Sequence, residues 1–406
     1  MNDFKKALKD FKSGKIIIIA DDENRESEGD FVCAASLCTQ ESVNFMVTNG
    51  RGLVCAPLTE ERATQLNLQK MAQKNSSRFE TAFTVSVEAA LGTTTGISAA
   101  ERALTCRTLA NFSKGANDFV CPGHVFPLVA RRGGVLERDG HTEATVELCR
   151  MAHLPLVGVL CEILNKDGTM ARIPQLKKIA KKHNLTFITV QDIIDYRLAN
   201  EILVERIAEP VVPTKFGTFK VIAYKNKING EEYVAFANPN FLSKKRTAAS
   251  SPVNVRIHSE CLTGDIFHSL KCDCGEQLEF SMNYITEHGG ILIYARGQEG
   301  RGIGLANKLR AYELQEQGLD TVEANLKLGF KADQRNYAFV AHILKELGIK
   351  SVNLLTNNPR KIAGIELCGI KIAKRIPVEI KANKYNKAYL AAKKKKMGHL
   401  LRAGIY

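Results

Sequence analysis

The hydrophobic positions of the amino-terminal half form short apolar runs that alternate with segments of helical periodicity. Continuous apolar runs at 15–20 and 156–164 predict buried strands. A capping-box pattern, in which a glutamate follows a capping serine, predicts a helix over 98–111. A proline in the first turn opens a basic helix over 174–183, and another helix is predicted over 191–200.

The carboxyl-terminal half repeats this mixture of short strands and helices. Two strands flank the turn 226–230, and apolar runs predict further strands at 253–258 and 291–295. Helices are predicted over 276–288, which a glycine pair ends, and over 304–317. The sequence therefore predicts an α/β protein with mixed sheets and flanking helices.

Length and proline positions bear on the domain organisation. A chain of 406 residues is long for one hydrophobic core, and typical domain sizes favour two domains. The helical pattern weakens near Pro210 and Pro213, which mark the predicted boundary. We therefore expect domains over 1–204 and 205–406, each built from a mixed sheet with flanking helices.

The composition is that of a globular protein, with 45% hydrophobic and 25% charged residues. No apolar run reaches the length of a membrane-spanning helix, and the first residues lack the features of a signal or transit peptide. The chain is therefore predicted to be cytoplasmic, without a membrane partner. Its eleven cysteines are expected to stay reduced. Apolar surroundings predict that several of them are packing residues, namely Cys33, Cys38, Cys149 and Cys161.

The net charge of +14 suits phosphate-bearing or polyanionic partners. Much of the excess lies in lysines between 381 and 396, and we interpret this run as a solvated face. Nucleic-acid binding would require aromatic or base-reading groups beside the lysines, so no nucleic-acid partner is expected. A zinc-containing nucleic-acid-binding protein is kept as the alternative from another class.

Three cysteines, Cys261, Cys272 and Cys274, have the spacing of a zinc site. A structural zinc ion normally has four protein ligands, whereas three ligands leave one position for water or substrate. Three thiolates therefore indicate a catalytic metal. The alternative is a structural ion with a distant fourth ligand such as His258 or His268.

A glycine-rich turn, 297–304, lies between a predicted strand and a predicted helix. Backbone N–H groups at a helix start favour phosphate, and Arg301 adds a fork of donors. The alternative is that the glycines only make a tight turn. Together with zinc, the turn suggests metal-activated water acting on a phosphate-bearing substrate.

Five separated motifs of this half, in order, closely resemble GTP cyclohydrolase II. They are Arg256-Ile-His-Ser-Glu-Cys-Leu-Thr-Gly-Asp, Cys272-Asp-Cys-Gly, Gln298-Glu-Gly-Arg-Gly-Ile-Gly-Leu, Asp320-Thr-Val-Glu-Ala-Asn and Leu355-Thr-Asn-Asn-Pro. The resemblance implies one zinc ion on the three cysteines, and hydrolysis of GTP with opening of the imidazole ring and release of formate and pyrophosphate. The GTP contacts that it implies are Arg256, Ile257, His258, Ser259, Glu260, Gln277, Glu299, Gly300, Arg301, Thr321, Thr356 and Lys361.

The same resemblance implies catalysis by Asp333 as general base and Arg335 as nucleophile toward the α-phosphorus. A guanidinium is protonated at neutral pH and lacks a free lone pair. We therefore interpret Arg335 as the group that neutralises the triphosphate and its leaving pyrophosphate. Without the motif, the two residues would be interpreted as a surface ion pair.

The segment 21–30 concentrates acidic side chains directly after a predicted buried strand. Magnesium prefers oxygen ligands, so one or two of these carboxylates, with substrate hydroxyls, are candidates to hold it. The alternative is a solvated acidic loop. His124, His141 and Glu162 supply groups that move protons beside a carbonyl, although a single histidine is more often a packing or surface residue.

These residues lie in runs that resemble 3,4-dihydroxy-2-butanone 4-phosphate synthase over residues 3–200, with Thr94-Thr-Gly-Ile-Ser-Ala, Gly123-His-Val-Phe-Pro and Arg138-Asp-Gly-His-Thr-Glu-Ala. The resemblance implies two magnesium or manganese ions on Glu26 and His141, and catalysis by His124 and Glu162. Ribulose 5-phosphate would be converted to 3,4-dihydroxy-2-butanone 4-phosphate and formate. The sugar-phosphate contacts that it implies are Arg25, Glu26, Asp30, Arg138, Asp139, Gly140, His141, Thr142 and Glu162.

Two positions bear separately on this resemblance. Asp139 stands where a small neutral residue is common, and its charge would repel a phosphate. We expect its side chain to point away or the substrate affinity to be weakened. Cys55 falls at an active-site cysteine of the family, yet its apolar context is equally that of a packing residue.

Together the halves resemble the fused, bifunctional enzyme of riboflavin biosynthesis, with ribulose 5-phosphate and GTP as substrates. We expect both sites to be active. A fusion with one silent half is the alternative within the same class. The resemblance also implies a homodimer in which the first active site is completed across subunits.

Overall fold

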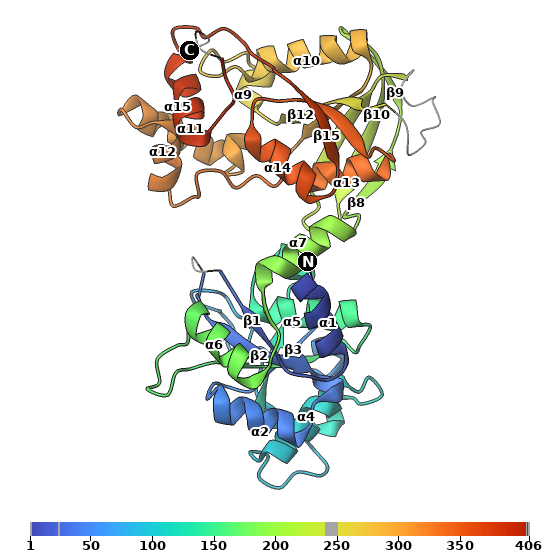
Figure 1. Ribbon diagram of the computed structural model, residues 1–406, viewed down its shortest axis with the longest axis vertical. Helices are drawn as coiled ribbons and strands as arrows, with labels where there is room; N and C mark the ends of the chain where they lie inside the picture. Colours follow the sequence, from blue (N-terminus) through green and yellow to red (C-terminus); the bar gives the residue numbers. More distant parts are fainter. Residues whose placement is uncertain (1, 23–24, 240–250, 403, 405–406) are drawn as a thin grey trace. The chain divides into compact units, whose positions relative to one another are not determined.

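The computed structural model describes residues 2–22, 25–239, 251–402 and 404 of the chain (Figure 1). It contains two compact units, Met1–Arg197 and Leu198–Tyr406. Each unit holds a mixed sheet with helices, so the predicted α/β class is confirmed. None of the described helices combines the length and the apolar character that crossing a membrane requires. The functional boundary between residues 204 and 205 stays a prediction.

The first unit is built on a seven-stranded sheet in the order β4-β5-β3-β6-β2-β1-β7. Its strands are β1 (Ile17–Ala20), β2 (Gly29–Ala34), β3 (Cys55–Leu58), β4 (Val87–Ala89), β5 (Phe119–Val129), β6 (Gly158–Glu162) and β7 (Phe187–Thr189). β1 pairs with β7 and β3 with β5 in parallel, whereas the other neighbours are antiparallel. The strands predicted at 15–20 and 156–164 are β1 and β6.

Helices cover both faces of this sheet. They are α1 (Asn2–Lys12), α2 (Gln40–Asn49), α3 (Glu60–Gln65), α4 (Ala99–Ala110), α5 (His141–Ala152), α6 (Ile173–His183) and α7 (Val190–Asn200). Alternate residues of β1 enter separate cores, because Ile17 and Ile19 pack with α1 and α5 whereas Ile18 packs with α2 and α4. A strand buried on both faces needs an unbroken apolar run, and this run marks the strand in the sequence.

Two smaller predictions for the first unit are also confirmed. Ser98 and Glu101 form a capping box at the start of α4. The cysteines expected to be packing residues are buried, namely Cys33, Cys38, Cys149 and Cys161. Cys55 is fully buried in β3 as well, so the structure favours packing for this cysteine.

The second unit is built on an eight-stranded sheet in the order β15-β14-β12-β13-β11-β10-β8, with β9 also paired to β10. Its strands are β8 (Val204–Ala208), β9 (Val211–Thr214), β10 (Gly217–Asn226), β11 (Glu232–Ala237), β12 (Val253–Ser259), β13 (Ile291–Ala295), β14 (Ser351–Leu355) and β15 (Lys371–Ile376). Strands from β15 to β13 run parallel, and those from β13 to β8 run antiparallel. Pro210 and Pro213 both lie inside this unit, Pro210 directly before the short strand β9 and Pro213 within it, where a missing N–H is tolerated.

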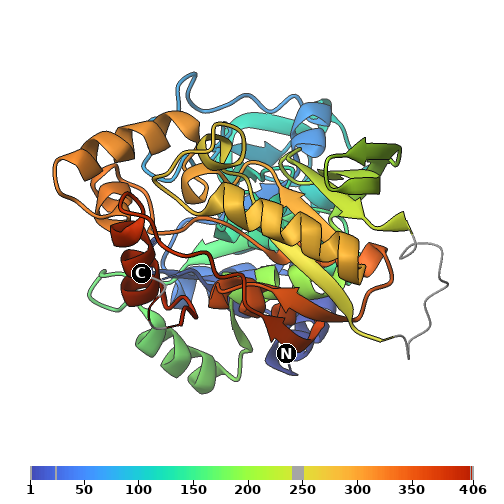
Figure 2. The ribbon, with the colours of Figure 1, turned by 90° about the horizontal axis from the view of Figure 1, so that it is seen from above.

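The helices of the second unit are α9 (Leu262–Asp265), α10 (Cys274–His288), α11 (Leu305–Glu316), α12 (Thr321–Lys327), α13 (Ala338–Glu346), α14 (Pro359–Leu367) and α15 (Lys387–Met397). Figure 2 shows α10, drawn in gold, lying across the sheet, and it packs on β12 and β13. The core beneath it is formed by Phe219, Met282, Ile285 and Leu292. Gly289 ends this helix, as predicted.

The carboxyl ends of the parallel strands β12, β13 and β14 meet at one edge of the second sheet. Loops from this edge carry Glu260 and Cys261 after β12, the turn 296–301 after β13, and Thr356 after β14. In open sheets, ligands bind outside the carboxyl ends of such strands, because side chains from several loops converge there. This edge therefore brings together motifs that are far apart in the sequence.

Candidate active sites

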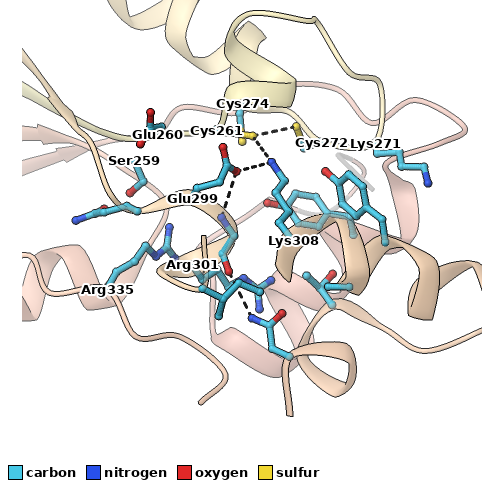
Figure 3. A pocket seen from close by; sticks show the side chains of 18 of the residues that line it. Ser259, Glu260, Cys261, Lys271, Cys272, Cys274, Glu299, Arg301, Lys308 and Arg335 are labelled. Atoms are coloured by element: carbon cyan, nitrogen blue, oxygen red, sulfur yellow. Dashed lines mark hydrogen bonds and ion pairs between the residues drawn. The ribbon is translucent and has the colours of Figure 1, made fainter. Parts of the chain in front are cut away.

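Cys261, Cys272 and Cys274 form a cluster between the end of β12 and the start of α10 (Figure 3). Their sulfur atoms lie within 4.8 Å of one another, and those of Cys261 and Cys272 are 3.8 Å apart. Thiolates on a tetrahedral zinc ion, with Zn–S bonds of about 2.3 Å, are about 3.8 Å apart. The cysteine cluster therefore fits zinc.

Neither histidine proposed as a fourth ligand joins the cysteine cluster. His258 Nε2 hydrogen-bonds Asp265 Oδ1 at 2.9 Å, and its ring stacks on Tyr294. His268 also stands outside the cluster, which among the described His, Cys, Asp and Glu residues contains the three cysteines alone. Three thiolates would leave one coordination position for water or substrate.

Lys308 on α11 approaches the cysteine cluster and was missed in the sequence. Its Nζ atom lies 3.1 Å from Cys261 Sγ, 2.7 Å from Thr263 Oγ1 and 2.6 Å from Glu299 Oε1. Burial opposes the charge, but Cys261 and Glu299 raise the pKa of Lys308, so the ammonium persists beside the sulfur atoms. Figure 3 shows Lys308 reaching toward Cys261 and Glu299. Helical periodicity alone gives no sign of a lysine that faces a metal site.

Two adjoining hollows open beside the cysteine cluster. The cysteine hollow, of about 630 Å³, is lined by the three cysteines with Glu299 and Lys308 among others. The cation hollow, of about 590 Å³, is lined by Arg256 and Lys361 among others. Residues that line both are Ser259, Cys274, Arg301, Arg335 and Tyr389. The two hollows therefore form one continuous site.

The structure gathers the predicted GTP contacts, except Ile257, around these two hollows. They are Arg256, His258, Ser259, Glu260, Gln277, Glu299, Gly300, Arg301, Thr321, Thr356 and Lys361. Ile257 lies in the buried strand β12, and its carbonyl oxygen accepts a hydrogen bond from Lys361 Nζ at 2.9 Å. Ile257 thus positions Lys361, while its own side chain belongs to the core.

Cationic side chains dominate the cation hollow. Arg256, Arg301, Arg335, Lys361 and Lys393 line it, and its described lining residues include no Asp or Glu. Burial, followed by the charges of Arg256, Arg335 and Lys393, lowers the pKa of Lys361. A multiply charged anion relieves such repulsion. The cation hollow therefore suits a polyphosphate.

Asp333 and Arg335 form a buried pair, so the surface-pair alternative is wrong. Arg335 donates from Nε to Asp333 Oδ1 at 2.9 Å and from Nη2 to Oδ2 at 2.8 Å, and Arg360 reaches the same carboxylate at 3.2 Å. Burial would raise the pKa of Asp333, but the two arginines outweigh it and lower the pKa. Burial would lower the pKa of Arg335, but Tyr337 and Asp333 raise it. A protonated guanidinium has no lone pair for nucleophilic attack.

The lysine-rich tail is not wholly the solvated face that we predicted. The Lys393 side chain on α15 is only 13% exposed, and its Nζ atom lies 2.8 Å from Asp273 Oδ1. Lys396 pairs with acidic residues at the start of α12. Tyr389 and His399 line the hollows. A run of like charges does not show which lysine meets a buried carboxylate, so these contacts were not predicted.

The first unit contains a third hollow, the carboxylate hollow, of about 740 Å³. The predicted ribulose 5-phosphate contacts that line it are Arg25, Glu26, Asp30, Arg138, His141, Thr142 and Glu162. Antiparallel pairing of β2 with β6 places Asp30 directly opposite Glu162. The start of α5 contributes His141 and Thr142. These elements bring two acids and a histidine to one place.

Asp21, Glu26 and His141 form a candidate cation site at the end of β1 and the start of α5. One donor atom of each lies within 4.8 Å of the others. Burial lowers the pKa of His141 to about 4, so its ring is neutral, and the buried Nε2 atom has no hydrogen-bond partner among the described residues. A neutral imidazole with an unpaired nitrogen beside two carboxylates fits a divalent cation. Asp21 adds to the two ligands that the resemblance implied.

The acidic segment 21–30 is not a solvated loop in its described part, which leaves out residues 23–24. Asp21 and Asp30 are 2% and 3% exposed. Burial, and then the charge of Glu162, raises the pKa of Asp30, and burial raises the pKa of Glu162. Carboxyl groups with raised pKa values are suited to proton transfer near neutral pH.

Arg138 is fixed beside the carboxylate hollow by Thr81 Oγ1 at 2.9 Å and Glu143 Oε2 at 2.6 Å. Asp139 does not line the hollow; its side chain is 59% exposed and lies 3.5 Å from Arg25 Nε. Gly140 is the N-cap of α5. The Asp139 carboxylate is therefore directed to solvent, the first of the two outcomes that we expected.

His124 is the predicted catalytic residue that does not line the carboxylate hollow. It lies on β5 with its side chain 47% exposed, and its Nδ1 atom contacts Glu88 Oε1 on β4. Glu88 is buried against Gly96 and Gly123, where an added Cβ atom would overlap it. Glu88 was not predicted as a partner of His124, because nothing in its short strand marks a pairing with histidine.

Comparison with known families covers both halves of the chain. Residues 5–196 match the model for 3,4-dihydroxy-2-butanone 4-phosphate synthase, and residues 205–377 match the model for GTP cyclohydrolase II. The chain is 53% identical over 396 residues to riboflavin biosynthesis protein RibBA of Bacillus subtilis, which covers 97% of this chain and 98% of that protein. It is 52% identical over 402 residues to the RibBA of Aquifex aeolicus, with 98% of each chain covered.

A solved structure is similar over both units. It is RibBX, described as a two-domain 3,4-dihydroxy-2-butanone 4-phosphate synthase from A. baumannii, with 33% identity and a TM-score of 0.67. The match covers 92% of this chain and 98% of that one. Its description names the first activity alone. In the present chain the second unit retains the three cysteines and the buried Asp333–Arg335 pair, which argues against a silent second half.

Proposed function

The chain belongs to the family of bifunctional riboflavin biosynthesis enzymes, and from this premise we propose how its own residues perform the two reactions. Its halves have 3,4-dihydroxy-2-butanone 4-phosphate synthase activity and GTP cyclohydrolase II activity. The two families imply ribulose 5-phosphate and GTP as substrates. We assign the first reaction to the carboxylate hollow and the second to the joined cysteine and cation hollows.

For the second reaction, the three cysteines would hold zinc, which supplies an activated water for attack on C8 of guanine. We place the guanine in the cysteine hollow and the triphosphate in the cation hollow. Glu299 is fixed by Lys308 Nζ and by the main-chain N–H of Leu262, each at 2.6 Å. A carboxylate held in this way is suited to orient polar groups of the base.

Arg335 lines both hollows, and we propose that it stabilises negative charge on the phosphates as pyrophosphate leaves. Asp333 holds the guanidinium with two parallel hydrogen bonds. To act as general base, Asp333 must first exchange Arg335 for substrate, because the ion pair keeps its pKa low. The contacts support a role for Asp333 in positioning Arg335. The family resemblance adds a role for Asp333 as proton acceptor.

For the first reaction, Glu26 and His141, with Asp21, would hold two magnesium or manganese ions, which supply charge stabilisation for enolisation. Arg138 and Thr142 would bind the phosphate through charge-assisted hydrogen bonds. Asp30 and Glu162 are candidates to move protons at neighbouring carbons, because their pKa values are raised. Dehydration, a shift of the carbon skeleton and loss of C4 as formate complete the reaction.

His124 is the remaining catalytic candidate of the first reaction, and we propose that a second copy of the chain supplies it. Its position outside the carboxylate hollow and its half-exposed ring support this proposal. Val120 on the same strand is exposed, as are Leu91 and Ile97 in the loop after β4. Exposed apolar side chains of this kind are suited to burial in an interface.

Formate release from each substrate tests the assignment of separate sites. Glu26→Ala is expected to abolish formate from ribulose 5-phosphate and to leave formate from GTP unchanged. Cys261→Ala is expected to do the reverse, and Cys368→Ala, at a buried cysteine outside the hollows, serves as its control. Loss of both activities in either site variant would contradict separate sites.

A further inference from the structure

Helix α15 lies beyond the segment that matches the GTP cyclohydrolase II model, which ends at residue 377. It nevertheless forms part of both hollows of the second unit. Tyr389 lines both, and Lys393, Met397 and the following His399 line the cation hollow. The helix packs on α12, beside which Figure 1 draws it in red.

Several contacts hold this helix and the residues after it against the site. Asn386 Nδ2 reaches the main-chain oxygen of Cys272 at 3.5 Å. Lys396 forms ion pairs with two carboxylates at the start of α12. The main-chain N–H of Leu400 donates to the main-chain oxygen of Asn357 at 2.8 Å. These contacts join α15 to the cysteine cluster, to α12 and to the loop after β14, so it is a fixed wall of the site.

Lys393 is the residue of α15 that points most clearly to a ligand. Its Nζ atom donates to Asp273 Oδ1 at 2.8 Å, and its side chain is largely buried. Asp273 Oδ2 accepts a hydrogen bond from Gln277 Nε2 at 2.6 Å, and Gln277 Oε1 accepts one from Arg256 Nη2 at 2.7 Å. Lys393 thus belongs to one network with two predicted GTP contacts. An ammonium has three donors, so it can bind a phosphate oxygen while it keeps Asp273.

The charge balance of the cation hollow favours several phosphates over one. Lys393 joins three arginines and Lys361 in lining it, and no carboxylate is among its described lining residues. Two carboxylates that do not line the hollow, Asp273 and Asp333, pair with Lys393 and Arg335 and offset part of the positive charge. A triphosphate supplies the rest of the negative charge, whereas a monophosphate supplies much less.

We propose that α15 is the polyphosphate-binding wall of the second site and that Lys393 is a substrate-binding residue that selects nucleoside triphosphates over monophosphates. The inference rests on the proposed function in taking GTP as the ligand. It adds a specificity residue beyond the segment matched by the family model. The buried Asp273–Lys393 pair holds the ammonium of a side chain that lines the cation hollow.

Titration calorimetry of the full-length, zinc-loaded enzyme with inorganic tripolyphosphate tests this proposal without requiring turnover. Lys393→Gln is expected to weaken tripolyphosphate binding at least about tenfold and to raise KM for GTP by a similar factor, with little change in kcat. Lys395→Gln changes an exposed lysine on the same helix and is expected to leave both values unchanged. Lys393→Arg keeps the charge and is expected to retain most of the affinity.

Unchanged tripolyphosphate binding in Lys393→Gln would overturn the inference, even if the wild-type enzyme releases formate from GTP. Equal loss in Lys393→Arg and Lys393→Gln would also overturn it, because packing and not charge would then carry the effect. If the wild type binds tripolyphosphate through Lys393 but releases no formate from GTP, the proposed function fails and the inference stands. Zinc content, measured alongside, is expected to be the same in all variants.

Discussion

The two units differ in how completely one chain assembles a site. In the second unit, loops from neighbouring parallel strands and the helices near them bring the predicted GTP contacts to two joined hollows. In the first unit, the antiparallel pair β2 and β6 and the start of α5 gather acids and Arg138, while His124 stays on β5 outside the hollow. Convergent strand ends gather the second site within one chain. His124, on β5 beside the edge strand β4, lies outside the carboxylate hollow, and we propose that it acts in the site of a second copy.

The charges of the hollows differ in the same way. The carboxylate hollow contains Asp30 and Glu162 with raised pKa values, which suits proton transfers on a singly phosphorylated sugar. The cation hollow gathers arginines and lysines, which suits a triphosphate. The donor sets also differ, because thiolates favour zinc whereas carboxylates and imidazole accept magnesium or manganese.

Metal exchange is expected to separate the two sites most strongly. After treatment with a chelator and return of magnesium alone, activity on ribulose 5-phosphate should recover. Formate release from GTP should stay at least about 10³-fold below its starting rate until zinc is added, because the cysteine cluster needs a thiolate-binding metal. Zinc content and formate are measured together, and recovery of GTP turnover with magnesium alone would contradict this difference.

Removal of one charge where the two hollows join is expected to have the next largest effect. Arg335→Gln should lower kcat for GTP about 10²-fold, because it removes a buried cation aimed at the leaving phosphates. Arg360→Gln is the matched control; its 48% exposed side chain contacts the same Asp333 carboxylate, and a loss below about threefold is expected. Equal losses of kcat in the two variants would contradict this prediction, because the effect would then come from the disturbed Asp333 carboxylate that both arginines contact.

A smaller effect is expected at the outer strand of the first unit. Glu88→Gln should lower kcat for ribulose 5-phosphate about tenfold, because the amide no longer holds His124 as a carboxylate does. Activity on GTP should not change. Glu80→Gln, at a 70% exposed glutamate of the same unit, is the control. An unaltered kcat and pH profile in Glu88→Gln would show that the pair is not used.

The smallest expected effect concerns acid stability of the second unit. Burial, and then Lys393 and Lys361, lowers the pKa of His399 to about 3. An unfolded histidine binds a proton below about pH 6.5, whereas folded His399 does so only near pH 3, so stability is lost as pH falls through this window. The melting temperature of the second unit should therefore fall less between about pH 7 and about pH 5 in His399→Gln than in the wild type. Equal falls would contradict this account.

Features that depend on local pattern were visible in the sequence. The buried strand β1, the capping box of α4 and the glycine that ends α10 each follow from a short stretch of residues. The three cysteines were visible as well, because metal binding restricts the residue types and the spacing. The resemblance to two families then named many of the residues that line the three hollows.

Features that depend on partners far away in the sequence were not visible. Lys308 faces a sulfur atom, Asp21 joins a histidine, and Lys393 meets a buried carboxylate. The two lysine charges are acceptable in the interior only because an acidic group compensates each of them, and tertiary structure alone brings these groups, and Asp21 and His141, together. Pro213 lies in β9, a strand paired to β10 alone that tolerates proline, so proline at this place is compatible with a strand inside the second unit.

Subunit mixing tests the central difference between the two sites most directly. His124→Ala and Glu162→Ala chains should each be inactive on ribulose 5-phosphate. Exchanged at equal amounts, they should recover about a quarter of wild-type activity, because each hybrid dimer contains one intact hollow. The same exchange of Cys261→Ala with Arg335→Gln should restore no turnover of GTP. Absence of recovery in the first mixture, although hybrid dimers form, would contradict a first site shared between two chains.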